Sequence, residues 1–590
     1  MNQAPTPHPC PRKGIAFCFL LLAVITLLTP CFAAEPQSDA KPLQQLAADF
    51  WAWRVRYQPF STDDIPRVEH PPGRRDWSTS SIAKQQTTLR EFEQRWSQMD
   101  VGSRNVAQQV DYRLLGSALA RVRWELDVNP RWQRDPTFYV SQALTAILET
   151  LVQPPPFDAR RSDELLTRME EIPGILQDGE ANLRPVRPFA QLAIDALAQV
   201  RPELLKVQEE VAPVLVNGSG QDLRKKFELA TEKAIASLES YRTWLQQHLD
   251  TMPAEAATGQ SSYQYFLNNV ALLPYTPEQL LALSQQEWDR AVAFEAYEQQ
   301  RNQDLPDLKI AANIDEQIRR SRADELAIRT FLNDKGILTV PAGIPHYTIG
   351  LVPAYLEGLS VFGELDDFTG PSRLQNDAVR WASLPSPNLG YFWLATAKDP
   401  RPDMVHEGVP GHYFQMSLSW RHEDPIRQHY YDSGANEGIG FYSEEMMLQA
   451  GLFDDSPRSR EIIYNFMRLR ALRVEVDVKL ALGLYTIPQA ADYLAKHVPM
   501  DRKTAEAEAA TFATTPGQAI TYQVGKSQIV GFLADAKMAQ GSKFSLRSFH
   551  DYVWKNGNVP IALQRWEYLG LDDEIKLLDE RRHRVPERNP

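Results

Sequence analysis

Three residues in the segment 404–415, MVHEGVPGHYFQ, have side chains suited to metal-assisted hydrolysis: His406, Glu407 and His412. Imidazole nitrogens bind zinc, and a carboxylate beside the metal can take a proton from its water. Zinc-peptidase helices usually place the second histidine four positions after the first, about 40° around the helix. Here it follows after six positions, about 120° away, so a regular helix would not direct both imidazoles at one ion.

Pro410 and Gly411 occupy the two surplus positions of this motif. Proline lacks the N–H that would bond back to residue 406, and glycine accepts unusual backbone angles. We therefore predict a bulge over residues 408–411 that brings His412 beside His406 as a second ligand. The alternative is that His406 ends one element and His412 begins another, each as an ordinary hydrogen-bonded histidine.

The segment ANEGIGFYSEEMM supplies a third candidate ligand, Glu437, 25 residues after His412 at the start of an apparent helix. Hydrolytic zinc sites commonly combine two histidines with one carboxylate and leave a position for water. Glu407 would then act as the general base on that water. Glu444 follows Glu437 by seven residues on nearly the same helix face, so it either supports a ligand or is a surface glutamate.

A second His-Glu pair, in SWRHEDPIRQHY, serves as an internal comparison. His422 and His429 are seven residues apart, which separates them by about 10 Å along a helix. That is too far for two ligands that each lie about 2.1 Å from a metal. We interpret them as surface or hydrogen-bonding histidines.

Polar residues downstream of the metal motif offer further functional groups. The Tyr522 hydroxyl could donate to an oxyanion, and Lys526, one helical turn later, could bind a substrate carboxylate. Ordinary packing and solvation is the alternative for both. Arg470, Arg473 and Asp477 are spaced by three and four residues, which predicts an internal salt-bridge ladder on one helix, with support of the site as the second interpretation.

Helical periodicity dominates the chain that must position these residues. Apolar residues recur every three or four positions in QQLAADFWAWRVRY, NVAQQVDYRLLGSALARVRWEL and PFAQLAIDALAQVRPELLKVQEEV. Thr276, Pro277 and Gln279 have the pattern of a capping box. Residues 338–396 lack this periodicity, and there we predict a small sheet in which GYFWLAT is a strand able to pair with an extended substrate. The expected fold is mainly α, with the sheet next to the metal-site helix.

The first 33 residues are typical of a secretory signal peptide, with a basic start, an apolar run and small residues at the end. A membrane anchor is the alternative, and Pro30 disfavours lipid attachment at Cys31. We predict a signal peptide over 1–33, an N-terminal helical region over 34–260, and a metal-site region over 261–590 that continues the same fold. The protein would be periplasmic or extracellular, and its mature part would hold none of the three cysteines.

Composition excludes several classes of partner. The 590 residues are 43% hydrophobic and carry a formal net charge of −13. An acidic chain without a basic block is a poor candidate for binding nucleic acid. Because no second apolar run is long enough to span a bilayer, we expect no integral membrane segment in the mature chain.

Four blocks in a fixed order resemble one bacterial family. HEGVPGH and EGIGFYSEE are similar to the motif of domain of unknown function 885, as are PGQAITYQVGKSQIVGF at 516–532 and FHDYVWKNGNVPIAL. The resemblance implies a large α-helical metallopeptidase-like fold, similar to zinc peptidases of the gluzincin type. It would assign His406, His412 and Glu437 to zinc and Glu407 to catalysis.

The combined prediction is an exported zinc metallopeptidase that cleaves small peptides. One alternative is a non-catalytic helical binding protein, although structural zinc sites normally have four protein ligands. Another is a zinc hydrolase of a different amide or ester, because the metal chemistry would be the same.

Overall fold

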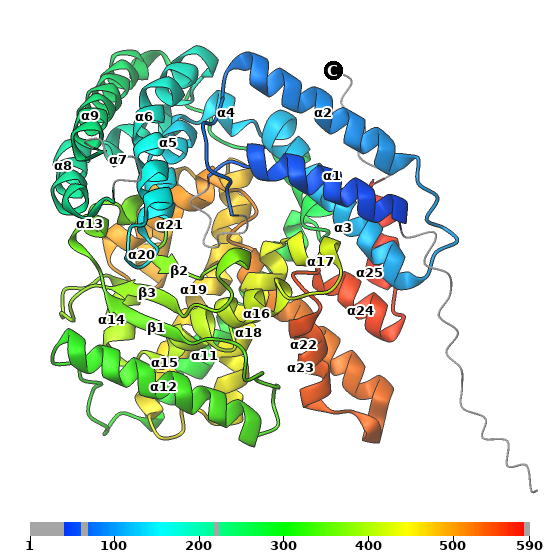
Figure 1. Ribbon diagram of the computed structural model, residues 1–590. Coiled ribbons are helices and arrows are strands. Elements are labelled where there is room, and N and C mark those ends of the chain that lie inside the picture. Colours follow the sequence, from blue (N-terminus) through cyan, green and yellow to red (C-terminus); the bar gives the residue numbers. More distant parts are fainter. Residues whose placement is uncertain (1–40, 61–68, 217–222, 583–590) are drawn as a thin grey trace, which may run out of the picture. The chain divides into compact units, whose positions relative to one another are not determined.

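Helices make up most of the described residues, 41–60, 69–216 and 223–582, of the computed structural model (Figure 1). The first ten helices are α1 (Lys41–Tyr57), α2 (Thr79–Ser97), α3 (Val106–Arg123), α4 (Arg131–Arg134), α5 (Pro136–Leu151), α6 (Ala159–Asn182), α7 (Arg187–Ala196), α8 (Val200–Val211), α9 (Leu223–His248) and α10 (Gln260–Tyr265). The next are α11 (Pro277–Arg301), α12 (Ile314–Asp334), α13 (Ala354–Glu357), α14 (Tyr391–Lys398), α15 (Arg401–Asp403), α16 (His412–Ser419), α17 (Pro425–His429) and α18 (Ser433–Ala450). The last are α19 (Pro457–Ala481), α20 (Ile487–His497), α21 (Arg502–Thr514), α22 (Thr521–Gln540), α23 (Leu546–Lys555), α24 (Ile561–Leu569) and α25 (Asp573–Arg582).

A three-stranded sheet accompanies the helices: β1 (Tyr347–Leu351), β2 (Asp366–Asp367) and β3 (Ala378–Ala382). The strand order is β1-β3-β2, with β1 parallel and β2 antiparallel to β3. The Tyr347 ring of β1 lies 5.9 Å from that of Tyr413, in the metal motif's second helix. The prediction of a mainly α fold with a small sheet is therefore confirmed.

The segment GYFWLAT is the helix α14, so its prediction as a strand was wrong. The Tyr391 ring packs 5.6 Å from that of Phe466 on α19, and the Tyr391 N–H donates to Asp501 at 2.9 Å. Tertiary packing of this kind overrides the β propensity of aromatic residues. The idea that this segment pairs with a substrate strand loses its basis.

Local sequence signals set several helix ends. The Thr276 hydroxyl accepts from the Gln279 N–H at 3.3 Å, and the Gln279 carboxamide oxygen accepts from the Thr276 N–H at 2.9 Å. This confirms the predicted capping box at the start of α11. The described residues from 42 onward form one compact unit, while the predicted signal peptide lies outside the described residues. Within the described part, no helix has the length and apolar character needed to cross a bilayer.

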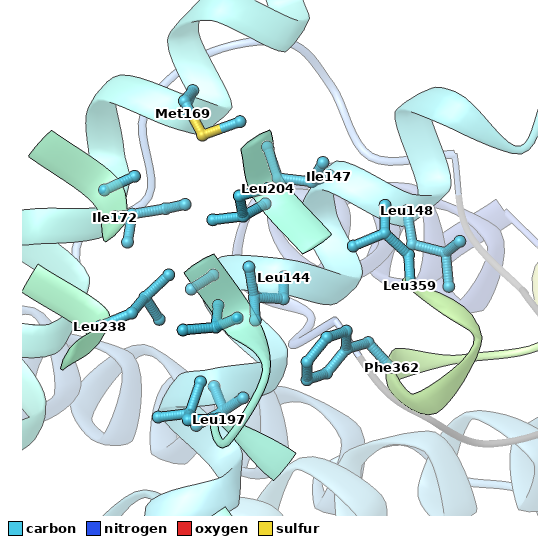
Figure 2. Packing of buried hydrophobic residues seen from close by; sticks show 14 of the residues in the cluster. Leu144, Ile147, Leu148, Met169, Ile172, Leu197, Leu204, Leu238, Leu359 and Phe362 are labelled. Carbon is cyan, nitrogen blue, oxygen red and sulfur yellow. The ribbon is translucent and has the colours of Figure 1, made fainter. Parts of the chain in front are cut away.

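A hydrophobic core joins α5, α6, α8 and α9 (Figure 2). Leu144, Met169, Leu204 and Leu238 come from these four helices in turn and are fully buried. Each such side chain contributes about 1.5–3 kcal/mol when it leaves water.

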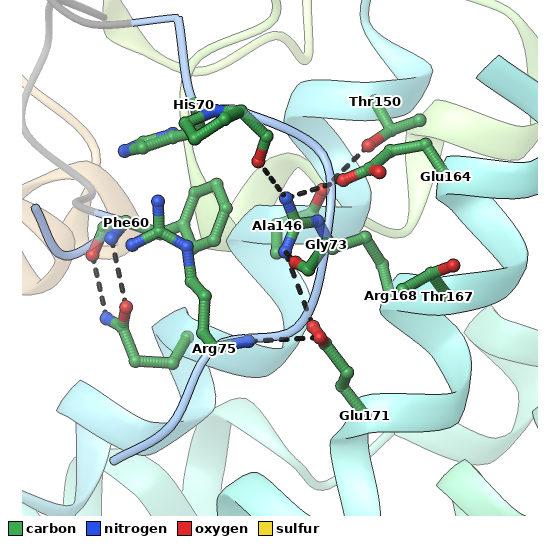
Figure 3. Close-up of polar contacts among 12 residues, drawn as sticks. Phe60, His70, Gly73, Arg75, Ala146, Thr150, Glu164, Thr167, Arg168 and Glu171 are labelled. Atoms are coloured by element: carbon green, nitrogen blue, oxygen red, sulfur yellow. Dashed lines mark hydrogen bonds and ion pairs between the residues drawn. The ribbon is translucent and has the colours of Figure 1, made fainter. Parts of the chain in front are cut away.

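Arg168 ties the chain segment before α2 to α6 (Figure 3). Its guanidinium donates to the Gly73 carbonyl at 3.0 Å and pairs with Glu164 at 2.5 Å. Nearby, both backbone polar groups of Phe60 bond to the Gln142 carboxamide at 2.9 Å. These contacts fix the Phe60 backbone against α5, and the Arg75 guanidinium lies 4.5 Å from the Phe60 ring centroid.

Candidate metal centre

The metal motif folds as two helical elements with a break between them. A π-helical turn, η7 (Met404–Gly408), continues α15 and carries His406. Val409 is extended, the Val409–Pro410 peptide is cis, and His412 begins α16. The predicted bulge within one helix was therefore wrong. Pro410 cannot donate the next helical bond, so the helix ends and a second one starts.

Gly411 allows the chain to fold back closely on His406. A Cβ atom at position 411 would lie 1.7 Å from the His406 carbonyl oxygen, which no side chain permits. As a result the rings of His406 and His412 meet edge to face, with centroids 4.7 Å apart. The predicted convergence is observed, although the two histidines belong to separate elements.

The carboxylate of Glu437, on α18, lies next to both imidazole rings. Its Oε2 lies 3.5 Å from Nε2 of His406 and 3.1 Å from Nε2 of His412. The ligand atoms of all three residues lie within 4.8 Å of one another, and all three residues are buried. Gly440, nearly one turn after Glu437, leaves room for the imidazoles, since its Cβ would lie 2.8 Å from His412 Cε1.

The three side chains fit a zinc ion. Two ligands about 2.1 Å from a tetrahedral ion lie roughly 3–3.5 Å apart, close to both carboxylate–imidazole separations here. Two imidazole nitrogens and one carboxylate oxygen are also the donor set of hydrolytic zinc sites.

Glu444 fixes the orientation of the His406 ring. Its Oε1 lies 2.6 Å from His406 Nδ1 and 3.5 Å from the Arg470 guanidinium. An imidazole that donates its Nδ1 proton to a carboxylate presents its Nε2 lone pair, which is the atom facing Glu437. Of the two interpretations of Glu444, the structure supports the one in which it holds a candidate ligand.

Replacing Glu444 with glutamine is expected to lower zinc affinity about 10- to 100-fold, because the charged acceptor of the His406 Nδ1 proton becomes a neutral and weaker one. Equilibrium titration against a zinc chelator measures this. The matched control is Glu445→Gln, which removes the adjacent carboxylate. Glu445 pairs with Arg290 at 2.8 Å, so its loss should reduce stability and leave zinc affinity unchanged. Equal zinc affinity in Glu444→Gln and wild type would contradict the orienting role.

Glu407 is the solvent-accessible carboxylate of the group. Its side chain is 24% exposed, whereas that of Glu437 is fully buried. Its Oε2 lies 4.0 Å from His412 Nε2, close to the ligand cluster but outside hydrogen-bond distance. Burial raises the pKa of the Glu407 carboxyl well above its usual range, and the Arg380 guanidinium opposes that shift.

Arg380 was missed by the sequence reasoning. It pairs with Asp366 at 2.6 Å and with Asp403 at 3.0 Å, one turn before Glu407. Arg380 and Asp366 come from β3 and β2, so this network fixes the sheet beside η7. No local motif marks these residues, because their partners are distant in sequence.

Tyr522 lies in the first turn of α22, next to the ligand cluster. Its ring is nearly parallel to that of His406, with centroids 6.0 Å apart, and the Arg473 guanidinium lies 4.5 Å from the Tyr522 ring centroid. Gly525 lets α22 cross α18 closely, since its Cβ would lie 2.1 Å from the Gly434 carbonyl oxygen. The structure thus brings Tyr522 to the site predicted for it.

Asp477 positions the loop that precedes α22. Its carboxylate accepts from the N–H groups of Gly517 at 2.9 Å and Ala519 at 2.8 Å. Burial raises the pKa of Asp477 to about 7, although these donors oppose the shift. The predicted ladder was wrong, because Arg470 pairs with Glu444 and Arg473 pairs with Glu508 instead.

Lys526 does not face the ligand cluster. It is 2% exposed, and its Nζ lies 2.9 Å from Glu445 and 3.4 Å from Glu287. These two carboxylates take the place that we had assigned to a substrate, so the substrate-binding interpretation is corrected to a buried ion pair. The cause is the burial of this face of α22 against α18 and α11.

The second His-Glu pair lies outside the cluster, as expected. His422 Nδ1 accepts from the Asp424 N–H at 2.9 Å, and His429 Nδ1 lies 2.8 Å from the Pro425 carbonyl oxygen. Both are hydrogen-bonding histidines.

Comparison with known proteins gives a family and a fold. A family model described as "bacterial protein of unknown function (DUF885)" matches residues 73–328 and 387–566. One similar structure is described as a "putative lipoprotein of unknown function" from Shewanella oneidensis, with TM-score 0.65 and 18% identity over 90% of this chain and 99% of that one. Another is a "putative lipoprotein" from Colwellia psychrerythraea, with TM-score 0.68 and 15% identity over 92% and 99%. No curated protein matches the chain.

Proposed function

We propose that this chain, which belongs to the DUF885 family of bacterial proteins of unknown function, is a zinc metallopeptidase, similar to the gluzincin type. The observation that carries the proposal is the convergence of His406, His412 and Glu437 at metal-ligand spacing. A solvent-accessible glutamate beside three buried ligands supports catalysis, because a structural site would need no such base.

His406, His412 and Glu437 would hold the zinc ion, which when bound supplies a Lewis acid and an acidified water. Glu407 would accept a proton from the attacking water at a carboxylate oxygen. It would then deliver that proton to the amine nitrogen as the peptide C–N bond breaks. The hydroxyl of one water thus ends on the acyl carbon and its proton on the amine.

Tyr522 would supply a phenolic donor for the negative charge that develops on the carbonyl oxygen. Its place beside His406 supports that role. Asp477 would act indirectly, as a positioning residue, by holding the loop that leads into α22.

Export belongs to the same proposal. The basic, apolar and small-residue order of residues 1–33 supports a signal peptide, and each of the two similar structures is described as a "putative lipoprotein". The protein would therefore act in the cell envelope or outside the cell, on peptides available there.

Metal analysis of the purified protein, followed by digestion of a peptide library read by mass spectrometry, tests the function. We expect about one zinc per chain and cleaved peptides, with turnover about 10²–10³-fold lower in Tyr522→Phe. A zinc-loaded protein that cleaves N-acyl amino acids or esters but no peptide would indicate a different hydrolase. A protein that binds no metal would contradict the proposal.

A further inference from the structure

An aromatic cavity of about 170 Å³ lies between α1, α3 and the segments that lead into α18 and α22. Aromatic rings dominate its lining, among them Trp51, Trp124, Trp132, Phe138 and Phe266. Phe60, which Gln142 holds in place, also lines it.

The volume suits one aromatic ring. An apolar cavity of about 150 Å³ stays dry and takes up benzene in a well-studied engineered protein. A cavity of similar size with aromatic walls therefore favours a six-membered ring, which gains edge-to-face and offset-stacked contacts there.

The cavity borders the start of α18, the helix that carries the candidate ligand Glu437. Gln518 and Tyr431 line it, and both contact Ser433: the Ser433 hydroxyl donates to the Gln518 carboxamide oxygen at 2.9 Å and lies 3.2 Å from the Tyr431 hydroxyl. Ser433 and Glu437 are four residues apart on α18, so they share a face and are separated by about 6 Å along the axis.

One arginine of the cavity is available to a ligand. Arg54 pairs with Glu125 at 2.7 Å, and Arg131 pairs with Asp135 at 2.8 Å. Arg121 also lines the cavity, over the Phe266 ring at 5.9 Å, and among the described residues it has no carboxylate within ion-pair distance. A guanidinium in such a pocket prefers a carboxylate, which it binds through two parallel hydrogen bonds.

We propose that this cavity receives the C-terminal residue of a peptide, with an aromatic side chain among the rings and the terminal carboxylate on Arg121. This deepens the proposed peptidase function and rests on it. The enzyme would then cleave near the carboxyl end of the peptide.

Binding of 3-phenylpropanoate tests the cavity without any catalysis, because this compound has the ring and the carboxylate but no cleavable bond. Its amide, 3-phenylpropanamide, is the matched ligand. We expect the acid to bind at least ten times more tightly than the amide, by calorimetry. Arg121→Gln should weaken binding of the acid about 10- to 100-fold, the cost of a charge-assisted hydrogen bond, and leave amide binding unchanged. Arg121→Lys should restore part of the affinity.

The control variant is Arg90→Gln, the same change at an exposed residue of α2 outside the cavity. It should bind both ligands as wild type does. Equal affinity for acid and amide, or no effect of Arg121→Gln, would overturn the proposal.

Digestion of paired peptides that end in phenylalanine, one with a free carboxylate and one with an amide, tests this inference separately from the proposed peptidase activity. Cleavage of the free acid alone, near its carboxyl end, supports both. Equal cleavage of both peptides, or internal cleavage, contradicts the cavity assignment and keeps the peptidase. Arg121-dependent binding of 3-phenylpropanoate without cleavage of any peptide contradicts the peptidase and keeps the carboxylate site.

Discussion

Glu407→Gln is expected to retain zinc and fold while turnover falls by about 10²–10⁴-fold. The substitution keeps the size of the side chain and removes its capacity to accept a proton. Glu407 Oε2 lies 4.0 Å from His412 Nε2, which is farther than the roughly 3–3.5 Å between two ligands of one tetrahedral ion. Glu407 is therefore placed beside the ligands and not among them. Steady-state kinetics on a cleaved peptide, with zinc content measured on the same sample, checks both parts of the expectation.

Glu423→Gln provides the matched control for this experiment. Glu423 also follows a histidine directly, but it is exposed, and His422 bonds to the Asp424 N–H instead of joining the cluster. The control should keep full turnover. Near-normal turnover in Glu407→Gln, with zinc bound, would mean that the base comes from elsewhere and would remove the main mechanistic support for a peptidase.

The signals that predicted the fold correctly are local. Helical periodicity and the Thr276 capping box depend on residues within one or two turns, and the structure contains the corresponding helices. GYFWLAT was misassigned because its aromatic residues have high β propensity, whereas its helical conformation depends on packing against Phe466, 74 to 75 residues from Tyr391 and Phe392. A single sequence does not contain that contact.

In the candidate site, too, the features that depend on local sequence were predicted and those that depend on distant contacts were not. Pro410 and Gly411 predicted that regular helix would be interrupted between the two histidines, since both residue types act on their own backbone, but the interruption is a break between two helices and not the predicted bulge. Arg380, Asp366 and Asp403 went unnoticed because their spacing in sequence is irregular and they meet only through the sheet. Lys526 was misassigned because helix periodicity gives the face of a residue without saying what covers that face.

Glu437→Gln is expected to lower zinc affinity by more than the 10- to 100-fold expected for Glu444→Gln, because it neutralises a ligand itself instead of a residue that orients one. Both glutamates are fully buried on α18, so exposure does not distinguish them. Geometry does: Glu437 Oε2 lies within 3.5 Å of the Nε2 atoms of both histidines, whereas Glu444 contacts Nδ1 of His406.

Thermal unfolding with and without zinc measures the difference in zinc affinity between the two variants, because a bound metal ion raises the free energy of unfolding. At a zinc concentration 100 times the wild-type Kd, bound metal should stabilise the wild type by about 2.7 kcal/mol. Glu437→Gln should lose most of this increment at the same zinc concentration, while Glu444→Gln should keep more of it because its Kd rises less. If Glu444→Gln lost the increment and Glu437→Gln kept it, the ligand and the orienting residue would be exchanged. Because Nδ1 of His406 faces Glu444 and Nε2 faces Glu437, such a result would assign the zinc ion to the other nitrogen of that ring.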